Sequence, residues 1–287
     1  MCIRDSIWGD ALSELDRAKP DLRIVNLETA VTTSEDYQPK GINYRMNPRN
    51  IPCITAAAVD CCVLANNHVL DWGRPGLIDT LNTLDAAGIA VAGAGRDLER
   101  ASAPAVMPVP GKGRVLVFAF AHESSGTPAS WTASDDRPGV NLLADLSKRT
   151  AARIADDIKA QRRPGDVVVV SIHWGANWGY RVPRDQRAFA HALIDRGAAE
   201  IVHGHSSHHP KAIEIRRGKP IFYGCGDFLN DYEGIEGYEA YRDDLVLMYL
   251  PAIDPAAGAL AALAVSYTHL RAHETVLDLV CRLLLEK

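Results

Sequence analysis

Several apolar runs in this chain end in residues that can bind a divalent metal ion or transfer a proton beside one. The runs LRIVNL, CCVLA, VVVVSI, EIVHG and PIFYGCG precede, in that order, Glu28, Asn66-Asn67-His68, His173, His205 and Asp227. Short runs rich in Val and Ile between turn residues are typical of buried strands, and sites in layered α/β proteins form at the carboxyl ends of strands. The pattern therefore predicts a metal-dependent enzyme.

Two of these segments offer oxygen ligands and a proton-transfer group. Glu28 could be a solvated loop residue or a helix cap, but with the other clusters it suits the carboxylate that two cations share. Asn67 offers a neutral amide oxygen as a ligand. His68 can act as a general acid or stabilise an oxyanion, and Asp71 can hold its imidazole in one tautomer. An Asn-rich turn is the simpler alternative, although it explains neither His68 nor Asp71.

The remaining candidates are histidines. His173 follows the most apolar strand, where a ligand role or a hydrogen bond would compensate for its burial. In the segment HGHSSHHP, His205 and His208 are separated by two small serines and form the best ligand pair. We expect His203 to pack within a strand and His209 to lie in a loop near substrate or solvent.

Helical and extended patterns alternate along the part of the chain that carries these residues. Up to residue 100 we expect helices at 9–18, 49–58 and 75–87, and strands at 22–27, 60–65 and 89–92. The helix at 75–87 has Pro75 in its first turn and Gly88 as its stop, which is the usual chemistry of helix ends.

Beyond residue 100, hairpins are mixed with strand–helix units. The turn at 110–113 joins strands at 104–109 and 114–121. Further strands are expected at 166–172, 199–203, 211–216, 219–224, 244–250 and 258–264, and helices at 142–162 and 183–196. Leu143 and Leu146 fall on the buried side of the expected helix at 142–162. The mixture predicts an α/β fold in which two mixed sheets lie between helices.

Both ends of the chain resemble translated sequencing-adapter sequence. We interpret residues 1–6 and 265–287 as non-native on that ground, and the alternative for the second segment is an amphipathic helix, because Leu277, Val280 and Leu284 keep helical spacing. Residues 7–264 then form a single domain, truncated at both ends, that is long enough to bury a large core.

The composition is ordinary for a soluble globular protein, with 47% hydrophobic and 23% charged residues and a net charge of −5. No Lys/Arg-rich stripe gives an electrostatic reason to expect nucleic acid. No apolar run approaches the ~20 residues of a membrane span. Without C-x-x-C pairs, buried free thiols are expected at Cys53, Cys61, Cys62 and Cys225.

The motifs NLETAVT, LANNHVLDWG, GAGRDLERASAP, SIHWG, VHGHSSHHPKAIE and YGCGDFLND, taken in this order, resemble the capsule-synthesis CapA family, also described as poly-γ-glutamate capsule biosynthesis proteins. The resemblance covers essentially all of residues 7–264. That family is similar in fold to the calcineurin-like metallophosphoesterases, which implies a four-layered α-β-β-α sandwich and a two-metal site.

The resemblance assigns roles to the residues that match the family motifs. Glu28 matches the bridging carboxylate, and His68 the catalytic histidine. Asn67, His173 and His205 match ligands of the second metal, and His208 matches the terminal ligand of the first. Arg45, His122, Asp227 and Asn230 are expected to border a substrate pocket, although each could be an ordinary loop residue.

The chain departs from the family pattern in three places. The N-terminal Gly-Asp strand, which supplies the remaining ligands of the first metal, is missing. Ala176-Asn177 stands where many relatives carry an acidic residue, and the loop reads GHSSH in place of GHHPH. We therefore expect weak occupancy of the second metal site alone and little two-metal catalysis. Two tightly held ions per chain after dialysis would contradict this.

The leading hypothesis is a metal-dependent hydrolase of cell-surface polymer biosynthesis, impaired in this truncated form. Mixed oxygen and imidazole ligands favour Mn, Fe or Zn. The substrate would be a phosphoester or an amide, with His68 protonating the leaving group. The alternative is a non-catalytic accessory protein that binds an anionic polymer or a capsule synthase component. The compartment is not set by the sequence, and a cell-surface or periplasmic location fits the family context.

Overall fold

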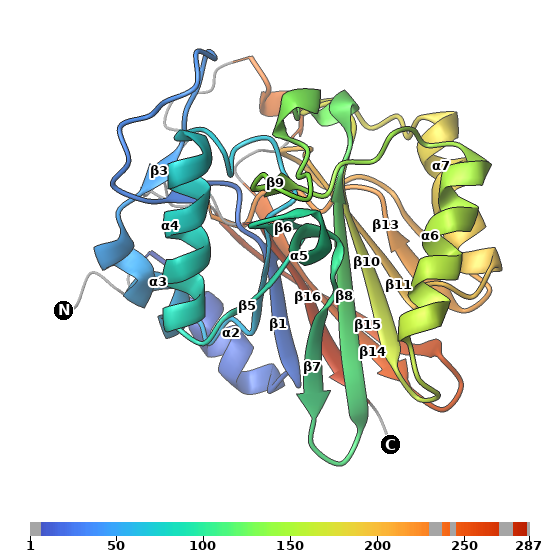
Figure 1. Ribbon diagram of the computed structural model, residues 1–287. Coiled ribbons are helices and arrows are strands. Elements are labelled where there is room, and N and C mark those ends of the chain that lie inside the picture. Colours follow the sequence, from blue (N-terminus) through green and yellow to red (C-terminus); the bar gives the residue numbers. More distant parts are fainter. Residues whose placement is uncertain (1–6, 230–236, 242–244, 270–277, 286–287) are drawn as a thin grey trace.

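The fold consists of two six-stranded sheets that face each other and are covered by helices on their outer sides (Figure 1). The structure is a computed structural model that describes residues 7–229, 237–241, 245–269 and 278–285. Two further pairs of short strands, β2 (Ala30–Val31) with β3 (Arg45–Met46) and β6 (Ala94–Gly95) with β9 (Gly139–Val140), lie in the connections.

The first sheet has the strand order β15-β14-β16-β1-β4-β5. Its strands are β1 (Leu22–Asn26), β4 (Cys61–Val63), β5 (Ala90–Ala92), β14 (Leu245–Asp254), β15 (Ala259–His269) and β16 (Asp278–Leu285). The strands β1, β4 and β5 are parallel, whereas β16 runs antiparallel to β1 and parallel to β14. The sheet is therefore mixed, as the sequence predicts.

The second sheet has the strand order β12-β13-β11-β10-β8-β7. Its strands are β7 (Ala105–Val109), β8 (Gly113–Ala121), β10 (Val167–His173), β11 (Ile201–His205), β12 (Ile213–Arg216) and β13 (Lys219–Phe222). The central strands β8, β10, β11 and β13 are parallel, and hairpins add the antiparallel edge strands β7 and β12.

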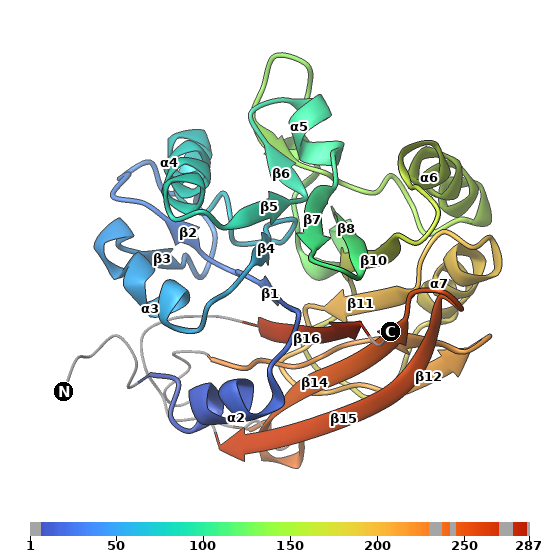
Figure 2. The ribbon, with the colours of Figure 1, turned by 90° about the horizontal axis from the view of Figure 1, so that it is seen from below.

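Helices cover the outer face of each sheet (Figure 2). The first sheet is covered by α2 (Ala11–Ala18), α3 (Ile51–Ala56) and α4 (Gly73–Ala86), and the second by α6 (Lys148–Gln161) and α7 (Arg184–Asp195). The connections contain the short helix α5 (Leu98–Ser102) and the 3₁₀ turns η1 (Pro48–Asn50), η2 (Glu123–Ser125), η3 (Ala129–Trp131) and η4 (Glu239–Tyr241).

Three apolar clusters fill the spaces between these layers. Alternate residues of a strand point to opposite faces, so Val167 and Val169 of β10 pack toward the first sheet whereas Val168 and Val170 pack under α6 and α7. A third cluster joins the outer face of the first sheet to its helices. The strands β4, β10 and β11 are buried along their whole length, and the architecture is the four-layered α-β-β-α sandwich.

The predicted helix at 142–162 is too long at its start. Helix α6 begins at Lys148, because the Ser147 hydroxyl accepts a hydrogen bond from the Thr150 amide and caps the helix. Leu143 and Leu146 are buried as expected, but they precede the helix. The amide of Leu143 donates to the carbonyl of Ala121, so this segment borders the end of β8 instead.

The helical alternative for the C-terminal segment is also wrong, since residues 278–285 form strand β16. Whether residues 265–287 are native stays a prediction, and residues 1–6 lie outside the described part. The four cysteines at 53, 61, 62 and 225 are free thiols as predicted, although Cys53 is only partly buried.

Gly204 makes a close main-chain approach that a side chain would disrupt. A Cβ atom there would lie 2.7 Å from the carbonyl oxygens of Phe222 and Tyr223 and from Nε1 of Trp174. We expect Gly204→Ala to lower the free energy of unfolding by about 1–3 kcal/mol, the usual cost of overpacking. Urea denaturation measures this effect. Gly41→Ala, where a Cβ meets nothing within 4 Å, is the control, and equal stability of the two variants would contradict the packing argument.

Candidate metal and proton-transfer site

Three predicted ligands come together at the carboxyl ends of β1 and β4 in the first sheet and β10 in the second. Glu28 follows β1, Asn67 follows β4, and His173 is the last residue of β10. His173 Nε2 lies 3.0 Å from Asn67 Oδ1 and 3.6 Å from Glu28 Oε1. Ligands that bind one cation at about 2.0–2.2 Å are roughly 3.0–3.6 Å apart. We call these three residues the donor trio.

His205 contacts the donor trio at His173. The two residues are paired across β10 and β11, and their Nδ1 atoms are 2.7 Å apart. The other nitrogen of His205, Nε2, lies 2.9 Å from Ser171 Oγ. In this arrangement both nitrogens of His205 contact protein groups, and its ring lies on the opposite side of His173 from Asn67.

His208 is held by Asp227, a residue that the sequence placed only at the pocket border. His208 Nδ1 is 3.0 Å from both carboxylate oxygens of Asp227, and both side chains are buried. A carboxylate in this position fixes the orientation of an imidazole. His208 also lies close enough to His68 and His173 to influence both electrostatically.

The loop that carries His205 and His208 has a strained backbone. Ser206 has a φ of 104°, a region that residues other than glycine rarely occupy. Its hydroxyl donates to the carbonyl of Gly175, and the amide of His208 donates to the carbonyl of Asn177. The loop is therefore anchored on the residues that follow β10.

Beside the donor trio, His68 and Asp71 form the predicted pair. His68 Nδ1 is 2.6 Å from Asp71 Oδ2, and Asp71 is fully buried. Lys40, which the sequence analysis did not identify, places its ammonium 2.7 Å from Asp71 Oδ1. The Tyr44 ring packs against the imidazole of His68 with 4.2 Å between ring centroids. The contact with Asp71 assigns the proton of neutral His68 to Nδ1 and leaves a lone pair on Nε2.

Burial lowers the pKa of the histidines in this region. The pKa of His68 lies below its ordinary value because burial outweighs the opposing effect of Asp71. Burial holds the pKa values of His173 and His205 well below the ordinary range, and lowers that of His203 to about 3. Near neutral pH these imidazoles are uncharged, which is the form that can bind a metal ion.

These shifts predict a loss of stability in mild acid. Above pH 6.5 the three fully buried histidines His173, His203 and His205 are neutral in both the folded and the unfolded chain. Below pH 6.5 the unfolded chain takes up protons that the folded chain cannot, so each histidine lowers the free energy of unfolding by roughly 1 kcal/mol per pH unit until its folded pKa is reached. Urea denaturation of the metal-free protein between pH 7.5 and 4.5 measures this slope.

Variants separate this effect from general acid denaturation. His203→Gln removes one buried group and is expected to make the slope shallower. Lys148→Gln, at an exposed residue at the start of α6, is expected to leave the slope unchanged. Identical slopes in His203→Gln and the parent would show that the burial argument is wrong.

The other predicted residues lie differently. Arg45 packs its guanidinium 4.0 Å from the Trp72 ring centroid and binds Glu35. The ring of His122 contacts Ser124, although its backbone amide donates to the carbonyl of His173. Asn230 lies outside the described residues, and its proposed role stays a prediction.

The donor trio fits one divalent cation by its chemistry, since it combines a carboxylate, an amide oxygen and an imidazole. Within the described ranges, no group of three or more His, Cys, Asp and Glu side chains is arranged so that it could hold a metal ion. The trio has only two such residues because its third member is Asn67. His205 was predicted to bind the same ion as Asn67 and His173, but its ring nitrogens contact His173 and Ser171. His208 was predicted to bind the other ion, and its Nδ1 contacts Asp227.

Two buried asparagines support the trio. Asn66 was noted only as part of the Asn66-Asn67-His68 segment, and Asn26 was not predicted. Asn26 Nδ2 donates to Glu28 Oε2 at 2.9 Å, and Asn66 Nδ2 donates to Asn26 Oδ1 at 3.1 Å. The Asn66 Oδ1 atom accepts from the amides of His68 and Val69. Asn26 and Glu28 are two residues apart at a strand end, and this period-two spacing was the available signal.

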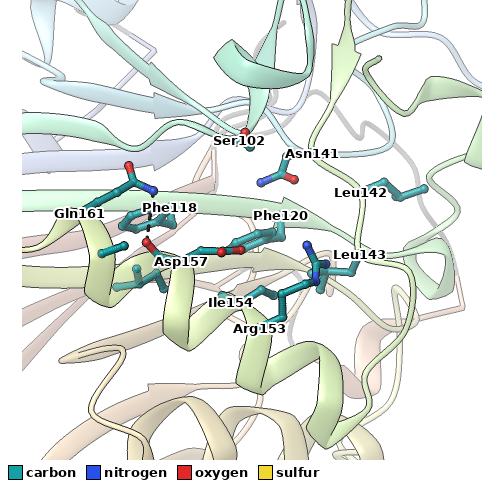
Figure 3. A pocket seen from close by; sticks show the side chains of 12 residues that line it. Ser102, Phe118, Phe120, Asn141, Leu142, Leu143, Arg153, Ile154, Asp157 and Gln161 are labelled. Carbon is teal, nitrogen blue, oxygen red and sulfur yellow. Dashed lines mark hydrogen bonds between the residues drawn. The ribbon is translucent and has the colours of Figure 1, made fainter. Parts of the chain in front are cut away.

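A separate cavity of about 270 Å³ lies between α6 and β8 (Figure 3). Its lining includes Phe118, Phe120 and Ile154, together with the charged residues Arg153 and Asp157. None of the predicted ligands lines it, so it is distinct from the donor trio.

In the described part of the chain, no helix combines the length and the apolar character needed to span a bilayer.

Comparisons with known proteins place this geometry in a family context. Residues 3–232 match the family described as "Bacterial capsule synthesis protein PGA_cap". The chain is 50% identical over 261 residues to a "probable polyglutamine synthesis accessory protein" of Mycobacterium tuberculosis, which covers 89% of this chain and 68% of that protein. It is 28% identical over 226 residues to the "PGA biosynthesis protein CapA" of Bacillus subtilis, over 78% of this chain and 56% of that protein.

Among solved structures, the fold is similar to that of a "novel phosphatase" of Mycoplasma pneumoniae. The TM-score is 0.44 at 10% sequence identity, and the match covers 90% of this chain and 94% of that chain.

Proposed function

The chain belongs to the PGA_cap family of bacterial capsule synthesis proteins, and we propose that it hydrolyses a phosphoester or an amide bond with the help of one divalent cation. The observation that carries this proposal is the position of the donor trio beside the His68–Asp71 pair. Oxygen and imidazole ligands together favour Mn, Fe or Zn. The ligand role of His205 and His208 stays a prediction.

The cation, when bound, supplies a Lewis acid that polarises a phosphoryl or carbonyl oxygen. The chain itself supplies proton transfer. Asp71 holds Nδ1 of His68 at 2.6 Å, which fixes the ring and leaves Nε2 to take a proton from an attacking water. The same nitrogen can then deliver the proton to the leaving group.

The rival function is a non-catalytic accessory role. The relative that is 50% identical is named an accessory protein, and an anionic polymer or a synthase component would then be the partner. Such a protein would keep the sandwich fold and could keep one cation without turnover.

Activity assays separate the two functions. The purified protein is incubated with Mn²⁺, Fe²⁺ or Zn²⁺ and with either bis(p-nitrophenyl) phosphate or a γ-glutamyl peptide, next to a chelator-treated sample. Metal-dependent turnover of either substrate supports the hydrolase. Binding of polyglutamate without turnover under every condition supports the accessory role.

A further inference from the structure

We propose that Lys40 is a positioning residue that holds both the proton-transfer pair and the peptide unit of a predicted metal ligand. This inference rests on the proposed function, because it assigns Lys40 to the same site. Lys40 lies in the irregular segment 32–44, between β2 and β3, and its side chain is 26% exposed.

The Lys40 ammonium contacts two separate parts of the site. Nζ donates to the backbone carbonyl of Asn67 at 2.5 Å and to Asp71 Oδ1 at 2.7 Å, and it lies 3.3 Å from His68 Nδ1. An ammonium group has three donors and no acceptor, and the two short contacts use two of them. The same ammonium lies 5.2 Å from the ring centroid of Trp131, within the range of a cation–π contact.

The contact with Asp71 compensates a charge that is fully removed from water. Asp71 Oδ2 is already 2.6 Å from His68 Nδ1 and accepts from the Tyr44 amide at 2.7 Å. Lys40 is the donor on the other oxygen and supplies the positive charge that a buried carboxylate needs. With both oxygens bound, the carboxylate cannot rotate, and the imidazole of His68 is held in one orientation.

The contact with Asn67 acts on the donor trio. The carbonyl that Lys40 binds belongs to the residue whose Oδ1 lies 3.0 Å from His173 Nε2. Fixing this peptide unit limits the positions that the amide side chain can take. A single ammonium therefore sets the geometry of His68 and Asn67 relative to each other.

The segment that delivers Lys40 is itself tied to Asp71. The amide of Gln38 donates to the Asp71 carbonyl at 2.7 Å, and Asn43 Nδ2 donates to the same oxygen at 3.2 Å. The amide of Tyr44 also donates to Asp71 Oδ2, so Gln38, Asn43 and Tyr44 all bind Asp71 independently of Lys40. Removing the Lys40 ammonium should leave the segment between β2 and β3 in place. It should change only the positions of the His68–Asp71 pair and of the Asn67 peptide unit.

The test compares Lys40→Met, which keeps the length of the side chain and removes its charge, with the parent and with Lys148→Met at an exposed residue of α6. The ¹⁵N NMR spectrum of the His68 imidazole needs neither substrate nor metal. We expect a single Nδ1–H tautomer in the parent and in Lys148→Met, and averaged tautomers in Lys40→Met. An unchanged His68 spectrum in folded Lys40→Met would overturn the proposal.

The Mn²⁺-loaded enzyme provides a second measurement. Groups that orient ligands are worth roughly 10–100-fold, so kcat in Lys40→Met is expected to fall by about that factor while KM changes less than about threefold. A change confined to KM would contradict a positioning role. If the parent has no activity, the proposed hydrolase function fails, and the NMR comparison still decides the role of Lys40.

Discussion

Replacing His68 with asparagine is expected to lower kcat of the Mn²⁺-loaded protein by roughly 10²–10⁴-fold, the usual contribution of a positioned acid–base group. His68 Nδ1 is held by Asp71 at 2.6 Å, so the variant loses the only part of this pair that can carry a proton to or from the reacting group. KM is expected to change little, because the donor trio remains. Steady-state kinetics on the substrate that the parent turns over measure both parameters.

The pH profile and a matched variant check that assignment. Since burial lowers the pKa of His68 below its ordinary value of 6.5, the neutral imidazole persists at pH 6.5, and kcat of the parent should fall only at lower pH. His191→Asn, on the outer helix α7, is expected to keep parental kcat. Because His68 is buried, thermal unfolding of both variants must show a folded protein. A folded His68→Asn variant with parental kcat would remove His68 from the mechanism.

The second large effect concerns metal affinity. Glu28→Gln keeps the shape of the side chain but removes the negative charge of the donor trio, and we expect the Mn²⁺ affinity to fall by at least roughly 100-fold. Even groups that only orient metal ligands are worth about 10–100-fold, and a carboxylate in direct contact contributes more. Isothermal titration calorimetry at pH 7.5 measures the affinity and the stoichiometry, which we expect to be one ion per chain.

Glu35→Gln is the matched control for this measurement. Its carboxylate is 82% exposed and pairs with Arg45, so this variant removes the same charge without touching the trio. It should bind Mn²⁺ as the parent does. Equal losses in the two variants would mean that general electrostatics, and not coordination by Glu28, sets the affinity.

The order of helices and strands could be predicted from the sequence because local patterns determine it. The Val-rich run before His173 forms β10, and the turn at 110–113 joins β7 to β8. The predicted start of α6 was wrong because Leu143 and Leu146 keep helical spacing, while the Ser147 cap and the contact with β8 decide where the helix begins. Apolar spacing alone does not distinguish a buried extended segment from a first helical turn.

Only those site residues that lie at the ends of strands could be predicted from the sequence. Glu28, Asn67 and His173 were found because each follows an apolar run. Parallel pairing brings the carboxyl ends of β1 and β4 to the same edge of the first sheet, whereas His173 comes from β10 of the second sheet. Lys40 was missed because it lies in an irregular segment and binds residues 27 and 31 positions later. The pairing of His208 with Asp227 was missed for a related reason, since it depends on how two loops meet across 19 residues.

Anomalous X-ray diffraction at the manganese edge, from crystals of the parent grown with Mn²⁺, shows where the ion binds. We expect one strong peak bounded by Glu28 Oε1, Asn67 Oδ1 and His173 Nε2, at about 2.0–2.3 Å from each atom. A Mn²⁺ ion bound elsewhere, or no peak at the donor trio at saturating Mn²⁺, would contradict it.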